Sequence, residues 1–497
     1  MISKDILPFN TVEKEGFLYL MNITAPLYKV PSRKTITKLI EEKYDILSNI
    51  IKTKLSSIDN LCLTTDVWTD VINTKSYLGV TAHFILNDKL TSVVIGVNEL
   101  DERHTSDYLG QWLLRICTEW HIGKDNVVAI VTDNAANIVK AVSDTFGKDK
   151  HLGCFAHTLN LVATSLLKHN NEVNALCAKV KALITFLKHS VIAADELRKY
   201  NTKKLIQSVP TRWNSTYYML ERFIELSENI TIILLKFPKA PPMLSALELQ
   251  LAKEVIQVLA PIEAVTKEIC GEQYVTSSKI IPLINCLKRK VNTLKDELTS
   301  STAIQLLESL SVNINMRFGD IENNTMLAVS TLLDPRFKRL HFNNQDACLQ
   351  TINKIVRQME NVNNDMFKEN NTTENAVMDN QKNSLWSYHN ELAYMEQLNC
   401  NDTEDMPTDF KHYLNQPIIG LHEDPIHYWL YSCKTMYLSL HVIAKKYLLI
   451  VATSVPSERL ISKTGNIVTE KRNKLSSEHL QCMLFLNSLS MHEWKIE

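Results

Sequence analysis

Three short β-type runs follow one another in a chain whose other periodic segments are typical of helices. The runs cover 61–65, 77–85 and 91–97, and polar turns such as Asn87–Lys89 separate them. Their close spacing predicts an antiparallel meander, because tight turns join antiparallel neighbours. A fourth run, 126–132, is apolar and suits a strand buried on both faces. We therefore expect a small sheet inside a mostly helical protein.

The scarcity of glycine agrees with that expectation. Only 11 of the 497 residues are glycine, about 2% against a usual value near 7%. β-Sandwiches, propellers and phosphate-loop assemblies need many backbone positions with positive φ, which glycine fills most easily, so these classes are disfavoured. The length predicts about three domains. With 45% hydrophobic and 22% charged residues, bulk disorder and a fibrous class are excluded.

Charge and cysteine usage limit the possible partners and compartments. The 54 Lys and Arg against 55 Asp and Glu leave a net charge of −1, which gives no bulk attraction to nucleic acid, so any DNA contact must be local. The ten cysteines include no Cys-x-x-Cys pair, which is typical of a reduced intracellular protein. We see no secretory signal and no apolar stretch long enough to span a membrane. We expect a cytosolic or nuclear protein without a membrane partner.

Helical periodicity dominates the rest of the chain. It extends over most of 155–360 and returns in a compact block from Asp424 to Leu489. Between these lies an Asn-rich and acidic segment with little apolar material, which we expect to be a mobile linker.

Two aspartates occupy positions where predicted strands end. Asp66 follows the run 61–65, and Asp133 follows 126–132. Two such carboxylates and a third acid can hold a pair of Mg²⁺ ions for phosphodiester chemistry. Aspartates at strand ends are more often turn formers or helix caps, and that alternative stays open. The third acid is Glu458 or Glu470. Each also fits a solvated helix surface, and periodicity does not choose between them.

Two further short motifs carry possible site residues. Cys154 and His157 form a Cys-x-x-His pair, but no second pair lies near enough to complete a zinc site, so a buried thiol and a histidine at a helix start are favoured. His157 could also contact a phosphate. After a predicted helix start at 210–211, Arg212 and Trp213 could supply a phosphate contact and a base-stacking face. The alternative places Trp213 in a helical core and pairs Arg212 with a carboxylate.

The order of these motifs resembles that of hAT-superfamily transposases and their BED-finger relatives. The segments that carry the resemblance are Thr64–Asp70, Val131–Asn137, Cys154–Leu161, Pro210–Thr216, Leu332–Lys338, Ala452–Arg459, Gly465–Asn466, Glu470–Asn473 and Leu484–Asn487. They span nearly the whole chain, and the ordered set is more specific than any single motif.

The resemblance implies a fold and a set of site residues. The implied fold class is α/β, an RNase H-like mixed sheet interrupted by a large all-helical insertion and closed by C-terminal hAT dimerisation helices. Asp66, Asp133 and Glu458 match the family's catalytic and metal-binding acids, which implies Mg²⁺ or Mn²⁺, whereas no zinc site is evident. The residues expected to contact DNA are Trp213, Arg212, His157, Lys471, Arg472 and Lys474.

The implied organisation has five parts. They are an N-terminal helical segment (1–58), the first part of the RNase H-like core (59–150), the helical insertion (151–360), the Asn-rich linker (361–415), and the dimerisation region with the rest of the core (416–497). Family members usually begin with a BED zinc finger, whereas this chain begins at a segment resembling the family's Asp-x-x-Pro-Phe (Asp5–Phe9). After Ser457–Arg459 the chain also departs from the family pattern, reading Leu460–Gly465.

The function implied is that of a nuclear, transposase-derived protein that forms homodimers or higher homo-oligomers through its C-terminal region and binds DNA. The retained acids would support DNA cleavage and strand transfer. Whether the chain is an enzyme stays open, with an active hAT transposase as the alternative. An interaction scaffold of helical repeats is an outside alternative, but it leaves the strand-rich segments unexplained.

Overall fold

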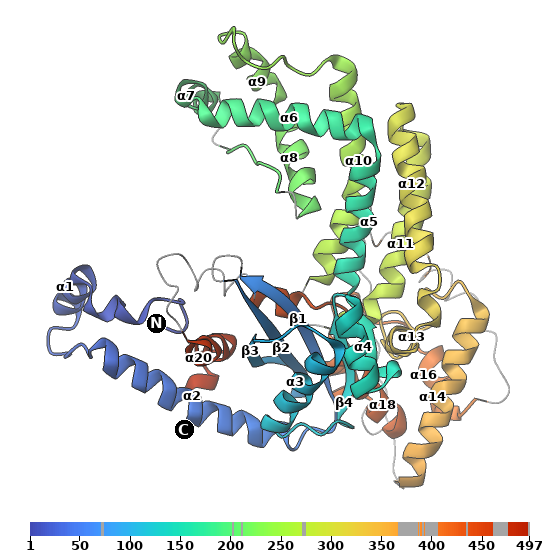
Figure 1. The fold of residues 1–497 in the computed structure, drawn as a ribbon. Helices are drawn as coiled ribbons and strands as arrows, with labels where there is room; N and C mark the ends of the chain where they lie inside the picture. Colours follow the sequence, from blue (N-terminus) through green and yellow to red (C-terminus); the bar gives the residue numbers. More distant parts are fainter. Residues whose placement is uncertain are drawn as a thin grey trace.

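A mixed sheet organises the computed structural model of the chain. The described residues are 1–70, 74–200, 203–209, 212–270, 275–365, 386, 388–389, 392, 406–433, 436–460 and 476–495. Within them a five-stranded sheet has the order β3-β2-β1-β4-β5 (Figure 1). The strands are β1 (Leu61–Asp70), β2 (Lys75–Leu86), β3 (Lys89–Leu100), β4 (Val127–Thr132) and β5 (His151–Gly153). The predicted meander and fold class are confirmed, because β1 to β3 pair antiparallel while β4 and β5 run parallel to β1.

The register brings the carboxyl ends of β1 and β4 to one edge of the sheet. Thr64 of β1 pairs with Val131 of β4, and in parallel strands these ends point the same way. The prediction that β1 ends before Asp66 is wrong, since β1 continues to Asp70 in its pairing with β2. Asp66 still lies two residues past the last β1–β4 pair, where β1 leaves the parallel part of the sheet. β5 has too few residues for a periodic pattern, and the sequence does not predict it.

Helices lie around the sheet (Figure 1), and buried clusters form on both of its faces, one containing Cys62 of β1 and the other Leu63. The elements around the sheet are η1 (Phe9–Glu13), α1 (Glu15–Thr24), α2 (Arg33–Leu55), α3 (Ser106–Glu119), α4 (Ala136–Thr145), η2 (Lys148–Lys150) and α20 (Ser477–Ser488). One buried cluster joins Leu63 of β1 to Leu113 of α3, Val142 of α4 and Phe485 of α20. Each such fully buried side chain contributes roughly 1.5–3 kcal/mol.

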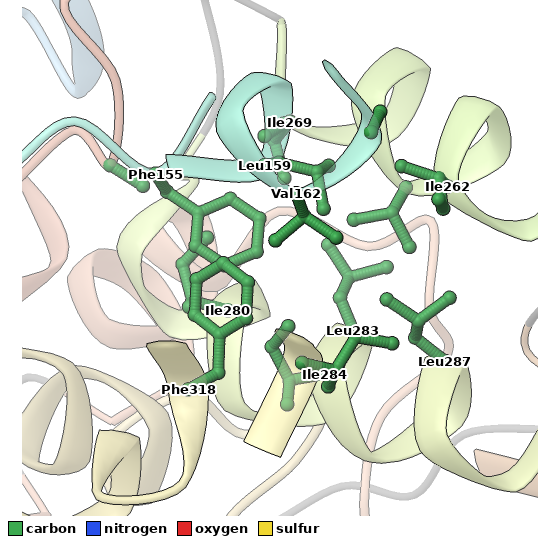
Figure 2. Packing of buried hydrophobic residues seen from close by; sticks show 14 of the residues in the cluster. Phe155, Leu159, Val162, Ile262, Ile269, Ile280, Leu283, Ile284, Leu287 and Phe318 are labelled. Carbon is green, nitrogen blue, oxygen red and sulfur yellow. The ribbon is translucent and has the colours of Figure 1, made fainter. Parts of the chain in front are cut away.

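A helical arm extends away from the sheet after β5 (Figure 1). Its elements are α5 (Phe155–His169), α6 (Asn171–His189), α7 (Val191–Tyr200), α8 (Trp213–Glu225), α9 (Ser227–Leu234), α10 (Ala246–Ile269), η3 (Ser277–Lys279), α11 (Ile280–Leu294), η4 (Lys295–Glu297), α12 (Ser301–Phe318) and η5 (Ile321–Asn323). Figure 2 shows the apolar core at its base, where the rings of Phe155 and Phe318 lie 5.0 Å apart. The helical stretch that begins at Trp213 is divided at the buried Leu226 into α8 and α9.

The C-terminal third returns the chain to the sheet. It contains α13 (Thr325–Leu332), α14 (Gln345–Asp365), α16 (Thr408–Asn415), α17 (Pro425–His427), η6 (Tyr428–Ser432), α18 (Leu438–Leu448) and η7 (Glu493–Lys495), and residues 455–460 are also helical. The predicted linker is wrong for 408–415, because Phe410 and Tyr413 of α16 are wholly buried. Most of 366–405 lies outside the described residues. No helix in the described part is long and apolar enough to cross a membrane.

The Leu332–Lys338 motif joins the arm to the C-terminal region. Lys338 is buried, and its Nζ donates to the backbone carbonyls of Tyr413, at 2.7 Å, and Gln416, at 2.5 Å. Beside it, Arg336 and Asp334 form a buried ion pair with an N–O distance of 2.6 Å. Buried charges are tolerated only when they are paired and hydrogen-bonded, so these contacts fix how α13 meets α16.

Candidate active site

A pocket of about 790 Å³ lies between the sheet edge and the base of the helical arm. Its lining comes from β1, the turn after β4, the start of α5, the start of α8, the end of α10 and the helical residues 455–459. Six predicted site residues line it together: Asp66, Asp133, His157, Arg212, Trp213 and Glu458. The remaining candidates lie outside the described residues: the basic residues Lys471, Arg472 and Lys474, and the alternative acid Glu470.

Asp66 is the most deeply placed of the three acids. Its side chain is 8% exposed, and Oδ1 accepts a hydrogen bond of 2.9 Å from the N–H of Val67. Burial, together with the smaller effect of the negative charges of Asp133 and Glu458, raises the pKa of Asp66 to about 7. The fold therefore disfavours ionised Asp66 unless a cation is nearby.

A tight turn places Asp133 directly after β4. Oδ1 of Asp133 accepts from the N–H of Ala135 at 3.1 Å, so the turn-forming role that we considered for this residue is present. Asn134 has a left-handed φ of 69°, and its Nδ2 donates to Oγ1 of Thr158 at 3.3 Å. A Cβ on Gly153 would lie 2.2 Å from Oδ1 of Asn134. A side chain at position 153 would displace the side chain of Asn134, so β5 and α5 contact the turn that carries Asp133.

Glu458 enters the pocket from the far end of the sequence. Burial raises the pKa of Glu458, as does the charge of Asp133, while the positive charges of His157 and Arg212 act in the opposite direction. The carboxylates of Asp66, Asp133 and Glu458 thus act on one another although up to 392 residues separate them along the chain. Of the two glutamates that the sequence left open, Glu458 lines the pocket, and Glu470 lies outside the described residues.

A buried polar chain holds the helix that carries Glu458 against β1. Oγ1 of Thr64 lies 2.9 Å from Oγ of Ser457 and 3.2 Å from Nε2 of His83. Burial lowers the pKa of His83 to about 3, so its imidazole is neutral. Further along the same helix, Leu460 packs with Trp68 of β1. These contacts fix residues 457–460 alongside the strand that carries Asp66.

Cys154 connects three segments around the pocket. Its backbone N–H donates to the carbonyl of Thr132 at 2.7 Å, and its Sγ accepts from the N–H groups of His157, at 3.4 Å, and Ser454, at 3.3 Å. Burial raises the pKa of Cys154 to about 11, which keeps it a thiol. The favoured interpretation, a buried thiol with His157 at the start of a helix, is confirmed.

Arg212 and Trp213 stand at the arm side of the pocket. Arg212 is exposed, and its charge acts on Glu458. Trp213 is the first residue of α8 and is 4% exposed within the hydrophobic core cluster. The structure therefore favours the core role of Trp213 over a free stacking face. The expected helix start at 210–211 lies outside the described residues.

Several pocket residues escape sequence reasoning. The polar side chains of Asn160, Asn214 and Tyr218 line the pocket, as does Arg459, whose Nη2 donates to the carbonyl of Cys270 at 2.8 Å. Arg459 could have been found, because it follows Glu458 directly. The others are single polar residues on amphipathic helices, where nothing in the periodicity separates a pocket residue from a solvated one.

The donor chemistry of the pocket suits a hard divalent cation. Mg²⁺ and Mn²⁺ favour carboxylate oxygens. Burial first, and then the neighbouring carboxylates, raise the pKa of Asp66, and a bound cation would favour its charged form. In the described part of the chain, however, no three His, Cys, Asp or Glu side chains are close enough together to ligate one ion. Metal binding here requires the three carboxylates to move closer together than they lie in this structure.

Three family models match separate parts of the chain. Residues 64–156 match the ZBED1 RNase-like domain, residues 152–258 match the ZBED1 RNase-like helical domain, and residues 409–490 match the hAT family C-terminal dimerisation region. Asp66 and Asp133 lie in the first match, Arg212 in the second and Glu458 in the third. The pocket is thus assembled from all three matched regions.

Curated relatives resemble the chain along its length. It is 24% identical to human zinc finger BED domain-containing protein 4 over 517 residues, which covers 98% of this chain and 42% of that protein. It is 26% identical to the putative AC transposase of Zea mays over 523 residues, or 96% of this chain and 62% of the relative. The Hobo transposase of Drosophila melanogaster is 26% identical over 249 residues, 47% of this chain and 37% of that protein. The chain therefore spans less than two thirds of the length of these relatives.

Proposed function

Since the chain is a hAT transposase-derived protein that carries ZBED1-type RNase-like domains and a hAT C-terminal dimerisation region, we propose that its acidic pocket binds DNA together with a divalent metal ion. The observation that carries this proposal is the shared pocket, which three carboxylates from distant parts of the sequence line together with an arginine and a histidine. We further propose that the protein acts in the nucleus as a homo-oligomer.

The pocket offers separate partners for a metal ion and for a phosphate. Asp66, Asp133 and Glu458 would hold Mg²⁺ or Mn²⁺, and their net negative charge by itself would repel a DNA backbone. Arg212 lies at the exposed rim with a guanidinium that suits a phosphate, and His157 sits in the first turn of α5, where the helix dipole favours anions. The chain's near-zero net charge makes DNA binding depend on this local arrangement and on the metal.

A bound divalent ion would polarise a phosphodiester and activate a hydroxyl nucleophile. The side chains of the pocket would do the rest. Arg212 and His157 would orient the phosphate, while the Thr64–Ser457 contact keeps Glu458 beside β1. Because its pKa is raised to about 7, Asp66 would be only partly ionised near neutral pH without metal, and a bound cation would favour its charged form.

DNA binding by the full-length chain tests the proposal. Fluorescence anisotropy with a labelled duplex should show tighter binding in Ca²⁺ or Mn²⁺ than in EDTA. Asp133→Asn should abolish this metal dependence, whereas the matched control Asp125→Asn, an exposed aspartate just before β4, should preserve it. When the logarithm of the DNA-binding constant is plotted against the logarithm of the salt concentration, Arg212→Ala should reduce the magnitude of the slope by about one. Metal-independent binding that is equal in all four proteins would refute a metal-assisted DNA site here.

Nicking of supercoiled DNA in Mn²⁺ decides between two forms of the proposal. A domesticated protein that has kept the site for binding gives no nicking in the wild type. An active hAT transposase, the alternative, gives nicking that Asp133→Asn abolishes and Asp125→Asn retains. Equal nicking by wild type and Asp133→Asn would rule out catalysis at this pocket.

A further inference from the structure

A second pocket, of about 600 Å³, lies between helix α14 and the segment formed by η5 and α13. Its walls come from positions between 322 and 329 and from positions of α14 between 347 and 361, and it shares no lining residue with the acidic pocket. Figure 1 shows α14 at the margin of the molecule, beyond α13. Small-molecule sites commonly have volumes of about 300–1,000 Å³, so this space, here called the α14 pocket, is large enough for a ligand.

A polar stripe of α14 forms one wall of the α14 pocket. Its side chains recur at intervals of three or four residues and therefore share one face of the helix: Gln350, Lys354, Arg357 and Asn361. Such a stripe is usually a solvated helix surface, but this one borders a concavity. Four side-chain amides line the pocket without a hydrogen-bond partner in the described part of the chain: Asn323, Gln350, Asn353 and Asn361. Their donors and acceptors are available to a ligand.

The two basic side chains of the stripe have no counter-charge. Nζ of Lys354 donates to the neutral hydroxyl of Thr325 at 3.1 Å, and Arg357 is exposed. Neither cation forms an ion pair with any residue that the structure describes. A spacing of three residues makes the two positive charges neighbours on the helix, where they repel each other. An anion held between them would replace this repulsion with attraction.

The acid in the lining is already occupied by backbone donors. Glu322 is 8% exposed, and its Oε1 accepts from the N–H of Asn343 at 3.2 Å while its Oε2 accepts from that of Asn344 at 2.8 Å. With this one acid and two cations, the lining carries a net positive charge. Thr325, the first residue of α13, also brings the positive end of that helix's dipole to the pocket.

The lining selects among anionic ligands. A guanidinium holds a phosphate through two parallel hydrogen bonds, and an ammonium group adds a point charge. Side-chain amides suit hydroxyl groups, which both donate and accept. The apolar lining residues are Val329 and Ala347, and no aromatic ring of the described residues lines the pocket, so a nucleobase has no face on which to stack. These features favour a phosphorylated polyol over a nucleotide or an apolar ligand.

DNA is a less suitable source of the phosphate. Besides its two cations, α14 contains three acids, Asp346, Glu360 and Asp365. A duplex laid along the helix would meet these acids as well as the cations, whereas strong DNA binding needs several cations along the path of the backbone. A small ligand inside the pocket would meet the two cations without the three acids, since none of these acids lines the pocket.

We propose that the α14 pocket binds a small phosphorylated polyol, with Arg357 and Lys354 on the phosphate and the side-chain amides of the lining on the hydroxyl groups. This inference goes beyond the proposed function and uses no residue of the acidic pocket. In the same wall, Nε2 of Gln358 donates to the hydroxyl of Tyr447 in α18 at 3.0 Å. A bound ligand would therefore also steady the contact between α14 and the C-terminal region.

Calorimetric titration of the full chain with glycerol phosphate, ribose phosphate and inositol monophosphate tests the inference. We expect saturable binding of at least one of these probes with a dissociation constant of about 1 mM or lower. Lys354→Gln/Arg357→Gln should weaken this binding at least about tenfold. The matched control Lys290→Gln/Arg317→Gln removes two exposed cations outside the pocket and should bind as the wild type does.

A second variant guards against a folding defect in the first. Asn353→Asp keeps the shape of the side chain but adds a negative charge to the lining, so it should also weaken binding of the probe. The thermal unfolding midpoints of the ligand-free variants should equal that of the control. Hydrogen exchange of the α14 amides should slow when the probe is added to the wild type and should not change in Lys354→Gln/Arg357→Gln.

Four results would overturn the inference. The first is that none of the three probes binds the wild type. The second is binding that both pocket variants retain in full, which would place the ligand elsewhere. The third is binding of inorganic phosphate or adenosine monophosphate at least as tight as that of every polyol probe. The fourth is a loss of affinity for duplex DNA in Lys354→Gln/Arg357→Gln without any binding of the probes, which would assign the two cations to a DNA backbone. Because the probe titrations do not involve the acidic pocket, either proposal can fail alone.

Discussion

Replacing Asp66 with asparagine should stabilise the metal-free protein at alkaline pH. Burial and two neighbouring carboxylates raise the pKa of Asp66 to about 7 from an ordinary value of 3.8. The unfolded chain therefore loses this proton near pH 4, whereas the folded chain holds it until about pH 7. The contribution of Asp66 to the free energy of unfolding is therefore most favourable below pH 4 and is lost as the pH rises from about 4 to about 7. Asparagine keeps an oxygen that can accept the Val67 N–H but has no proton to lose.

The magnitude follows from the width of that window. A difference of about three pH units at 1.36 kcal/mol per unit gives at most about 4 kcal/mol. Asp66→Asn should therefore exceed the wild type in stability by up to about 4 kcal/mol at pH 8 and match it within about 1 kcal/mol at pH 4. Some pH dependence should remain in the variant, because burial also raises the pKa of Glu458.

Hydrogen exchange of the β1 and β4 amides in EDTA measures this effect, since it reports the opening free energy of that part of the chain. Asp125→Asn, at the opposite end of β4 from Asp133, should follow the wild type at every pH. Addition of Mn²⁺ should make the wild type more stable than Asp66→Asn, because a ligand that binds only the folded wild type stabilises it. A variant that is equal to or less stable than the wild type at pH 8 in EDTA would refute the buried-charge argument.

Two further substitutions test how the acids are held. Gly153→Ala should lower the local stability of β4 and β5 by about 1–3 kcal/mol, because the added Cβ displaces Asn134. The control Gly16→Ala, where a Cβ meets no heavy atom within 4 Å, should raise stability by at most about 1 kcal/mol. Hydrogen exchange compares the two variants, and equal effects would contradict the steric argument. Ser457→Ala should lower the free energy of unfolding by about 1 kcal/mol, because it removes the contact with Thr64. It should also weaken Mn²⁺ binding as measured by calorimetry. Unchanged metal affinity would show that this contact does not position Glu458.

The fold was predictable where local patterns are long. The runs that predict β1 to β4 alternate or stay apolar over five or more residues, and each of these strands is present, although β1 continues past its predicted end to Asp70. Both β5 and the division between α8 and α9 depend on tertiary packing, which no local pattern records. The Asn-rich composition before α16 concealed the buried Phe410 and Tyr413, whose burial comes from contacts with distant segments.

The site was predictable in its acids and less so in its supports. The strand-end pattern singled out Asp66 and Asp133, which line the pocket, but it offered no reason to place Glu458 there, since that position depends on a contact between residues 64 and 457. The bridging role of Cys154 was equally hidden, because its sulfur accepts from a backbone N–H 300 positions away. Trp213 could be assigned to two roles from sequence, and only its burial favours the core.

Calorimetric titration of the full chain with Mn²⁺ tests the central claim most directly. We expect saturable binding by the wild type and by Asp125→Asn. Asp66→Asn, Asp133→Asn and Glu458→Gln should each weaken binding by at least about tenfold, or about 1.4 kcal/mol. Absence of binding by the wild type, or equal binding by all five proteins, would contradict the assignment of a divalent metal site to this pocket.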